Sequence, residues 1–215
     1  MIDNLINHIP NITIVCTPPN SGKSYLIKYL LTELFRHKKF KYGIVFCPTK
    51  FNGSYDFLPK EYIHSQYKEN TLIKFYNLQI KQHKDKGKAP PAFVVFDDCI
   101  GSVNFDSDIM KKLASTYRLS NMTLIFATQY IYRIPTTIRE WQLFFVTFKQ
   151  TKVNSFKAIQ ETFISEKSVK DVKEFINDVT KEKHNFILVN VLEDDENKYT
   201  IGKAPEKYKP FKIKY

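Results

Sequence analysis

Residues 12–24 constrain the fold of this chain more than any other segment. An apolar, β-prone run at 12–16 leads into a turn-rich stretch, Thr-Pro-Pro-Asn-Ser, and then into Gly-Lys-Ser at 22–24. Apolar residues next recur at helical spacing, which predicts a helix over about 22–38. This order is typical of a P-loop, in which backbone N–H groups and a helix N-terminus face a polyphosphate. We therefore expect a nucleoside triphosphate and Mg²⁺ as ligands.

Each residue of this loop has an expected role. Lys23 would reach the β- and γ-phosphates, and the Ser24 hydroxyl would ligate Mg²⁺. Thr17 departs from the G-x-x-x-x-G-K-[ST] pattern, because it stands where the first glycine is usual. We expect this change to alter the shape and affinity of the loop without altering its ligand. The predicted nucleotide-binding residues are Pro19, Asn20, Ser21, Gly22, Lys23, Ser24 and Tyr25.

Two later strands are each predicted to end in polar side chains. Asp97 and Asp98 follow the apolar run 92–96, which is the Walker B arrangement. There Asp97 would hold Mg²⁺ and Asp98 would act as the catalytic base toward a water molecule. Gln129 follows the run 123–128 and could hydrogen-bond the γ-phosphate or that water. The structural alternatives are an acidic turn after a buried strand and a simple capping glutamine.

Arginines lie on both sides of the strand that ends at Gln129. Arg118 precedes this strand, and Arg133 and Arg139 follow it. A guanidinium suits the charge that develops on a transferring phosphoryl group, and a neighbouring subunit often supplies it. Each of the three could equally be a solvated surface charge.

The rest of the chain predicts an α/β fold, with a mostly parallel central sheet and helices on both of its faces. Buried strands alternate with helical patterns, and 49–68 looks like an irregular connection. One domain over 1–215 is expected, with a basic C-terminal tail at about 203–215. Further strands are predicted at 42–47, 92–96, 122–128, 141–148, 185–192 and 199–202, and further helices at 69–86, 106–118, 155–162 and 169–181.

Composition narrows the class of protein. The net charge of +11 is spread along the chain, which suits contact with phosphate backbones. A lysine-rich surface from a biased genome would give the same excess. The three cysteines lack the spacing of a metal site or disulfide framework, so reduced, buried thiols are expected. No apolar run reaches about 18 residues and no signal-peptide pattern is present, so a soluble, intracellular protein is expected.

Two segments carry a family resemblance. The run Tyr-Arg-Leu-Ser-Asn-Met-Thr-Leu-Ile-Phe-Ala-Thr-Gln at 117–129 is followed by Ile-Pro-Thr-Thr-Ile-Arg at 134–139. Together they closely resemble the genome-packaging ATPases of large DNA viruses and virophages, which include the poxvirus packaging ATPase and belong to the FtsK–HerA superfamily. The resemblance spans 12–148. The arginine, strand, glutamine and Ile-Pro block is much more specific than the P-loop.

The resemblance implies roles for the matching residues. Gln129 matches the sensor glutamine of the family, and Arg118 matches its loop arginine, a candidate finger acting in trans. Besides Thr17, one position departs from the family pattern: Leu119 stands where a histidine often follows the arginine. The resemblance also implies a homo-oligomeric ring, a pentamer or hexamer, that moves double-stranded DNA into a preformed capsid. It would work in the host cytoplasm, at the virus factory, or associated with the virion.

Three other functions compete with this interpretation. A DNA helicase or a DNA-transfer ATPase of a mobile element would use the same site on a different substrate. A nucleotide kinase usually needs an arginine-rich lid, and the sequence after Gln129 shows no such cluster. A capsid protein that only binds nucleotide would not depend on Asp98.

Overall fold

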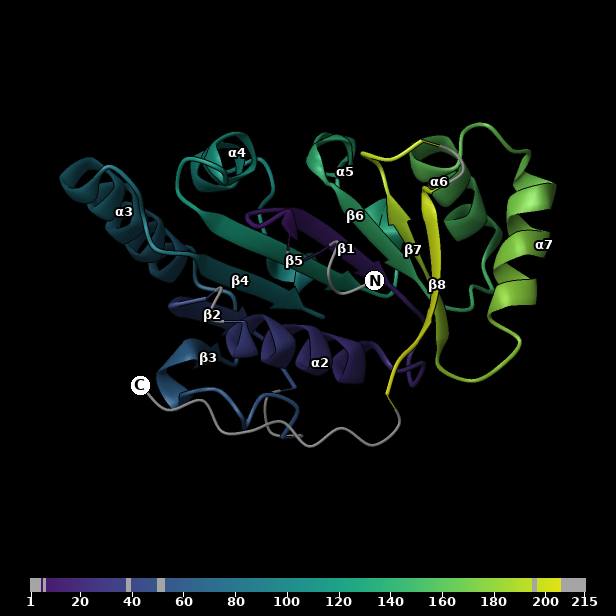
Figure 1. Ribbon diagram of the computed structural model, residues 1–215, viewed down its shortest axis with the longest axis horizontal. Helices are drawn as coiled ribbons and strands as arrows, with labels where there is room; N and C mark the ends of the chain where they lie inside the picture. Colours follow the sequence, from purple (N-terminus) through teal and green to yellow (C-terminus); the bar gives the residue numbers. More distant parts are fainter. Residues whose placement is uncertain (1–4, 6, 38–39, 50–52, 195–196, 206–215) are drawn as a thin grey trace.

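The structure is a computed structural model that describes residues 5, 7–37, 40–49, 53–194 and 197–205. The described residues form an eight-stranded sheet (Figure 1). Its strands are β1 Ile12–Cys16, β2 Tyr42–Phe46, β3 Ile63–His64, β4 Ala92–Asp97, β5 Met122–Thr128, β6 Phe144–Thr147, β7 Asn185–Asn190 and β8 Tyr199–Lys203. Their order across the sheet is β3-β2-β4-β5-β1-β6-β7-β8.

The pairing divides the sheet into two parts. The six neighbouring strands β3, β2, β4, β5, β1 and β6 pair in parallel. The pairs β6–β7 and β7–β8 are antiparallel. Every residue of β1, β4 and β5 is buried. Their nearly continuous apolar sequences suit strands that are covered on both faces.

Helices cover the two faces of the sheet unequally (Figure 1). They are α2 Lys23–Arg36, α3 Glu69–Lys86, α4 Asp108–Thr116, α5 Thr136–Trp141, α6 Val153–Phe163 and α7 Val169–Val179. One hydrophobic core packs the sheet against apolar residues of α3 to α7. The other packs it against α2 and the turn at 55–58. Short 3₁₀ turns lie at Lys60–Tyr62, Ile100–Ser102 and Ile131–Arg133.

The structure corrects one predicted strand. A strand was expected over 141–148, but Trp141 is the last residue of α5 and β6 begins at Phe144. Pro135 precedes α5, and its fixed φ suits the start of a helix. Helix α5 is only six residues long, too short to show a helical repeat of apolar residues. Strand β3 within the connection 49–68 was also not predicted.

The ends of the sheet and chain complete the comparison. The strands expected at 185–192 and 199–202 are β7 and β8. Most of the predicted basic tail, 206–215, lies outside the described residues. Within the described part of the chain, no helix combines the length and the apolar character that crossing a membrane requires.

Candidate active site

The carboxyl edge of the parallel strands gathers the predicted site residues. Strand β5 lies between β1 and β4, and its register pairs Thr128 with Cys16 and Ala127 with Asp97. The three strands therefore end at the same level. The P-loop, the two aspartates and Gln129 leave the sheet side by side as a consequence.

Hydrogen bonds within the loop explain how it forms without its first glycine. Thr17 is fully buried and lies outside the left-handed region, so its backbone does not require glycine. Its N–H donates to Thr128 O at 3.0 Å. Its hydroxyl hydrogen-bonds the Ser21 hydroxyl, which donates to Pro18 O at 2.6 Å. The side chains of Thr17 and Ser21 thus add hydrogen bonds within the loop that a glycine at position 17 could not make.

Gly22 is required at its position for two reasons. Its φ is 108°, in the left-handed region that disfavours other residues. A Cβ at this position would also lie 2.9 Å from His184 Nδ1. The same His184 nitrogen lies 3.3 Å from Ser21 O. The histidine, which precedes β7, therefore packs directly on the backbone of the loop.

Lys23 forms the electrostatic centre of the site. Its Nζ lies 3.0 Å from Asp97 Oδ1 and also forms an ion pair with Asp98. Burial acts to lower the pKa of Lys23, but the two carboxylates outweigh it and the pKa is raised. Tyr55 OH donates to the other oxygen of Asp97 at 2.9 Å. Asp97 is therefore fixed at both oxygens, by a cation and by a phenol.

One cavity of about 440 Å³ opens over this centre. Predicted residues line it together with Pro18, Thr49, Ser54 and His184, which were not predicted. Asp98 directly follows β4 and Gln129 directly follows β5, and the rest of the predicted lining comes from the loop and α2. The full lining is Pro18, Pro19, Asn20, Gly22, Lys23, Ser24, Tyr25, Thr49, Ser54, Asp98, Gln129 and His184.

Two predicted residues lie just outside this cavity. Asp97 is only 2% exposed and lies beneath it. Ser21 lines a neighbouring hollow together with His184.

The three arginines have different surroundings. Arg133 lines a hollow of about 160 Å³ together with Asp98 and Gln129. Arg118 is exposed near the amino end of β5, where its guanidinium packs on the Tyr117 ring. Arg139 hydrogen-bonds Ile134 O and the hydroxyls of two threonines. We call the cavity of about 440 Å³ over Lys23 the phosphate cavity. Of the three arginines, only Arg133 lies beside the phosphate cavity of its own chain.

The oxygen donors fit a magnesium ion. No group of three or more His, Cys, Asp or Glu side chains gathers in the described residues. Mg²⁺ is usually held by one or two carboxylates together with substrate phosphates and waters. The Ser24 hydroxyl and the buried Asp97 carboxylate match that pattern.

Comparisons with known proteins place the chain. The family model described as Poxvirus A32 protein matches residues 2–204. The chain belongs to this family. A second viral relative, Uncharacterized protein 075L of Invertebrate iridescent virus 6, is 28% identical over 149 residues. That alignment covers 68% of this A32-family chain and 57% of the relative, so the chain spans little more than half of that protein.

Solved structures share the fold of this A32-family protein. The genome packaging NTPase B204 from Sulfolobus turreted icosahedral virus 2, in complex with AMPPCP, matches with a TM-score of 0.68 and 17% identity. The match covers 91% of this chain and 98% of that one. The pCW3 conjugation coupling protein TcpA matches with a TM-score of 0.60 and 14% identity, over 91% of this chain and 60% of that one.

Sequence reasoning about this A32-family chain missed His184 and Tyr55. Both contact the site from segments outside the recognised motifs. His184 approaches the loop from the turn before β7, and Tyr55 lies in the connection after β2. No local pattern marks either residue, because only the folded chain brings them to the P-loop and to Asp97.

Proposed function

We propose that this A32-family protein is an ATP-hydrolysing motor subunit that packages double-stranded viral DNA into a preformed capsid. The observation that carries the ATPase part is the contact of Lys23 with both Asp97 and Asp98 beside the cavity of the P-loop. Family membership and the fold shared with a genome packaging NTPase support the packaging part.

Binding of ATP begins with an exchange of partners at Lys23. The triphosphate carries several negative charges into the cavity and takes the place of the carboxylates around the ammonium group. The N–H groups at the start of α2 face the phosphate oxygens, and the helix dipole favours their charge. Ser24 and Asp97 would hold Mg²⁺, which neutralises charge on the phosphate oxygens when it is bound.

Asp98 and Gln129 act on the attacking water. The water oxygen bonds to the γ-phosphorus, the bond to the β–γ bridging oxygen breaks, and Asp98 accepts the proton that the water releases. Gln129 orients the water or the γ-phosphate. Arg133 lines a hollow together with Asp98 and Gln129. From there it could stabilise, within its own subunit, the negative charge that develops on the transferring phosphoryl group.

The partners follow from the packaging role. Double-stranded DNA would meet a chain of net charge +11, and lysine and arginine neutralise phosphates without regard to sequence. Capsid proteins and further copies of this chain in a pentameric or hexameric ring complete the motor. It would act in the host cytoplasm, at the virus factory or on the virion.

ATP turnover with and without double-stranded DNA tests the proposal. We expect DNA to stimulate the wild type. Lys23→Ala should lose nucleotide binding, and Asp98→Asn should keep binding but lose about 100-fold or more in turnover. Lys81→Ala and Asp85→Asn, on the exposed side of α3, are matched controls that should behave as wild type.

Two results would redirect the proposal. Turnover that ignores DNA and survives Asp98→Asn would overturn the motor assignment. DNA-stimulated turnover accompanied by strand separation would identify a helicase instead.

A further inference from the structure

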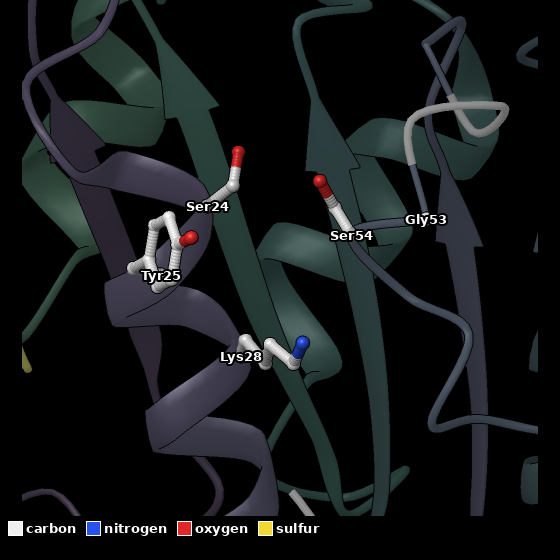
Figure 2. A pocket seen from close by; sticks show the side chains of 5 residues that line it. All are labelled: Ser24, Tyr25, Lys28, Gly53 and Ser54. Carbon is white, nitrogen blue, oxygen red and sulfur yellow. The ribbon is translucent and has the colours of Figure 1, made fainter. Parts of the chain in front are cut away.

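A second hollow adjoins the phosphate cavity. It measures about 220 Å³ and shares Ser24, Tyr25 and Ser54 with that cavity. Figure 2 shows it between the first turns of α2 and the turn after β2. Its lining is Ser24, Tyr25, Lys28, Gly53 and Ser54. We propose that this hollow is the nucleoside subsite, which holds the base and ribose of the nucleotide; the proposal rests on the proposed ATPase function.

The direction of the bound nucleotide follows from the ends of the phosphate cavity. Asp98 and Gln129 mark the end where the γ-phosphate reacts. Backbone N–H groups lead away from that end through the loop to Ser24 and Tyr25 at the start of α2. The α-phosphate therefore comes to the start of α2, and the nucleoside continues beyond it.

On the other side of the P-loop, His184 stands between the phosphate cavity and a hollow of about 260 Å³. His184 Nδ1 lies 3.3 Å from Ser21 O, and a single Cβ on Gly22 would come within 2.9 Å of it. Phe148, which lines the hollow beyond the histidine, is only 1% exposed. Among the described residues, the rings on that side are this buried phenylalanine and the half-buried His184, and neither is as exposed as Tyr25. The open path runs between Tyr25 and Ser54.

The residues of the second hollow suit a nucleoside. Tyr25 is 49% exposed, and its ring borders the hollow with the hydroxyl turned toward it (Figure 2). Aromatic side chains hold bases by stacking on the base face. The Lys28 ammonium group and the Ser54 hydroxyl also face this space (Figure 2). Both are hydrogen-bond donors that match the oxygens of a ribose and the acceptor atoms of a base.

Gly53 lines the side of the hollow opposite α2 and places no side chain in it. It adopts φ 72°, in the left-handed region, so the turn favours a residue without a side chain. A ring can therefore enter the hollow without displacing a side chain of residue 53.

The test separates the nucleoside from the phosphates. Isothermal titration calorimetry with Mg²⁺ would measure binding of AMPPCP, which carries the nucleoside, and of inorganic tripolyphosphate, which does not. Tyr25→Ala should weaken AMPPCP binding about tenfold and leave tripolyphosphate binding unchanged. Tyr25→Phe keeps the ring and should stay within about twofold of wild type. Tyr42→Ala, an exposed tyrosine at the amino end of β2, is the matched control.

Each contrary result has its own meaning. If Tyr25→Ala binds AMPPCP as tightly as wild type, or weakens both ligands equally, the nucleoside subsite is wrong while the ATPase proposal stands. If His184→Ala weakens AMPPCP selectively and Tyr25→Ala does not, the base lies on the opposite side. If the wild type binds neither ligand, the ATPase proposal itself fails.

Discussion

At the scale of single residues, Thr17 shows how a P-loop tolerates a departure from its usual sequence. Its side chain does not enter the phosphate cavity; instead its hydroxyl bonds across the loop to Ser21. A buried hydroxyl that is hydrogen-bonded contributes about 1 kcal/mol to stability. Thr17 therefore acts as a brace for the loop.

Thr17→Val should destabilise the protein and loosen its site. Valine keeps the shape of threonine but removes the hydroxyl that bonds Ser21. We expect the melting temperature to fall by about 2–4 °C and the KM for ATP to rise. Differential scanning calorimetry and steady-state turnover measure both effects. Exposed Thr137→Val is the control, and an unchanged melting temperature in Thr17→Val would show that the brace has no role.

The sequence predicts the site residue by residue only where a local motif exists. Loop residues 19–25, the two aspartates and Gln129 all follow strands that could be identified from apolar runs. Tyr55 and His184 reach the site through the turn after β2 and the turn before β7. Their positions depend on tertiary packing, to which no spacing pattern corresponds.

At the scale of elements, β2 and β4 pack through a glycine and a ring. A Cβ added to Gly43 would lie 2.0 Å from atoms of the Phe93 ring. The ring is fully buried and contacts Phe35 and Phe40 edge-on or tilted. It therefore has little room to move away. Gly43 is required here because of space, since its φ lies outside the left-handed region.

Gly43→Ala should therefore be strongly destabilising. Overpacking of a core commonly costs about 1–3 kcal/mol, and an approach of 2.0 Å places this site at the upper end. Phe93→Leu alone should also destabilise, because it removes ring contacts. The double variant should be more stable than the sum of the two losses predicts. Urea unfolding of all four proteins measures this coupling, and simple additivity would contradict the packing described.

The carboxyl edge of the sheet also holds the three cysteines. Cys16 ends β1, Cys47 follows β2 and Cys99 follows β4, and all three are buried free thiols. Burial raises the pKa of Cys16 and of Cys99 from 9.0 to about 12 and also raises that of Cys47. Since thiolate is the reactive form, these thiols should be inert in the folded protein.

Thiol reactivity and alkaline stability should both follow these shifts. In a thiol-labelling assay at about pH 8, the folded protein should react slowly with the reagent. The unfolded protein should react at all three cysteines, consuming three equivalents of reagent per chain. The folded thiols stay protonated where unfolded thiols ionise, so the free energy of unfolding should fall as pH rises above 9.0 toward about 12. Rapid labelling of the native protein would contradict the burial of these residues.

The sequence predicts the elements in proportion to the strength of their patterns. The long helices and, apart from β6, the buried parallel strands match their predicted ranges within about two residues. Helix α5 and strand β3 were missed because six and two residues are too few to show a repeat.

At the scale of the whole molecule, Arg118 lies at the opposite edge of the sheet from the candidate active site of its own chain. It precedes β5 at the amino edge, whereas Gln129 follows β5 at the carboxyl edge. If Arg118 acts in phosphoryl transfer, a neighbouring subunit must receive it. Arg133 is the cis candidate by the same geometry.

Mixtures of variant subunits test this division. If Arg118 is the finger, Arg118→Ala should be inactive alone, as should Lys23→Ala, which cannot bind nucleotide. If Arg118 acts in trans, the mixture should regain turnover at interfaces that pair an intact Lys23 with an intact Arg118. Arg139→Ala, whose guanidinium is bonded within its own chain, should instead lower the melting temperature. A mixture as inactive as its components would exclude the trans role.

Strand β5 then has a consequence for timing. Seven residues, Met122–Thr128, span roughly 23 Å between Arg118 at one edge and Gln129 at the other. Hydrogen bonds to β1 and β4 hold this strand on both sides. If copies of the chain form a ring, the proposed sensor Gln129 of one subunit and the Arg118 proposed to reach the next subunit would lie at the two ends of one rigid strand. A displacement at Gln129 on phosphate release would then move Arg118 together with it.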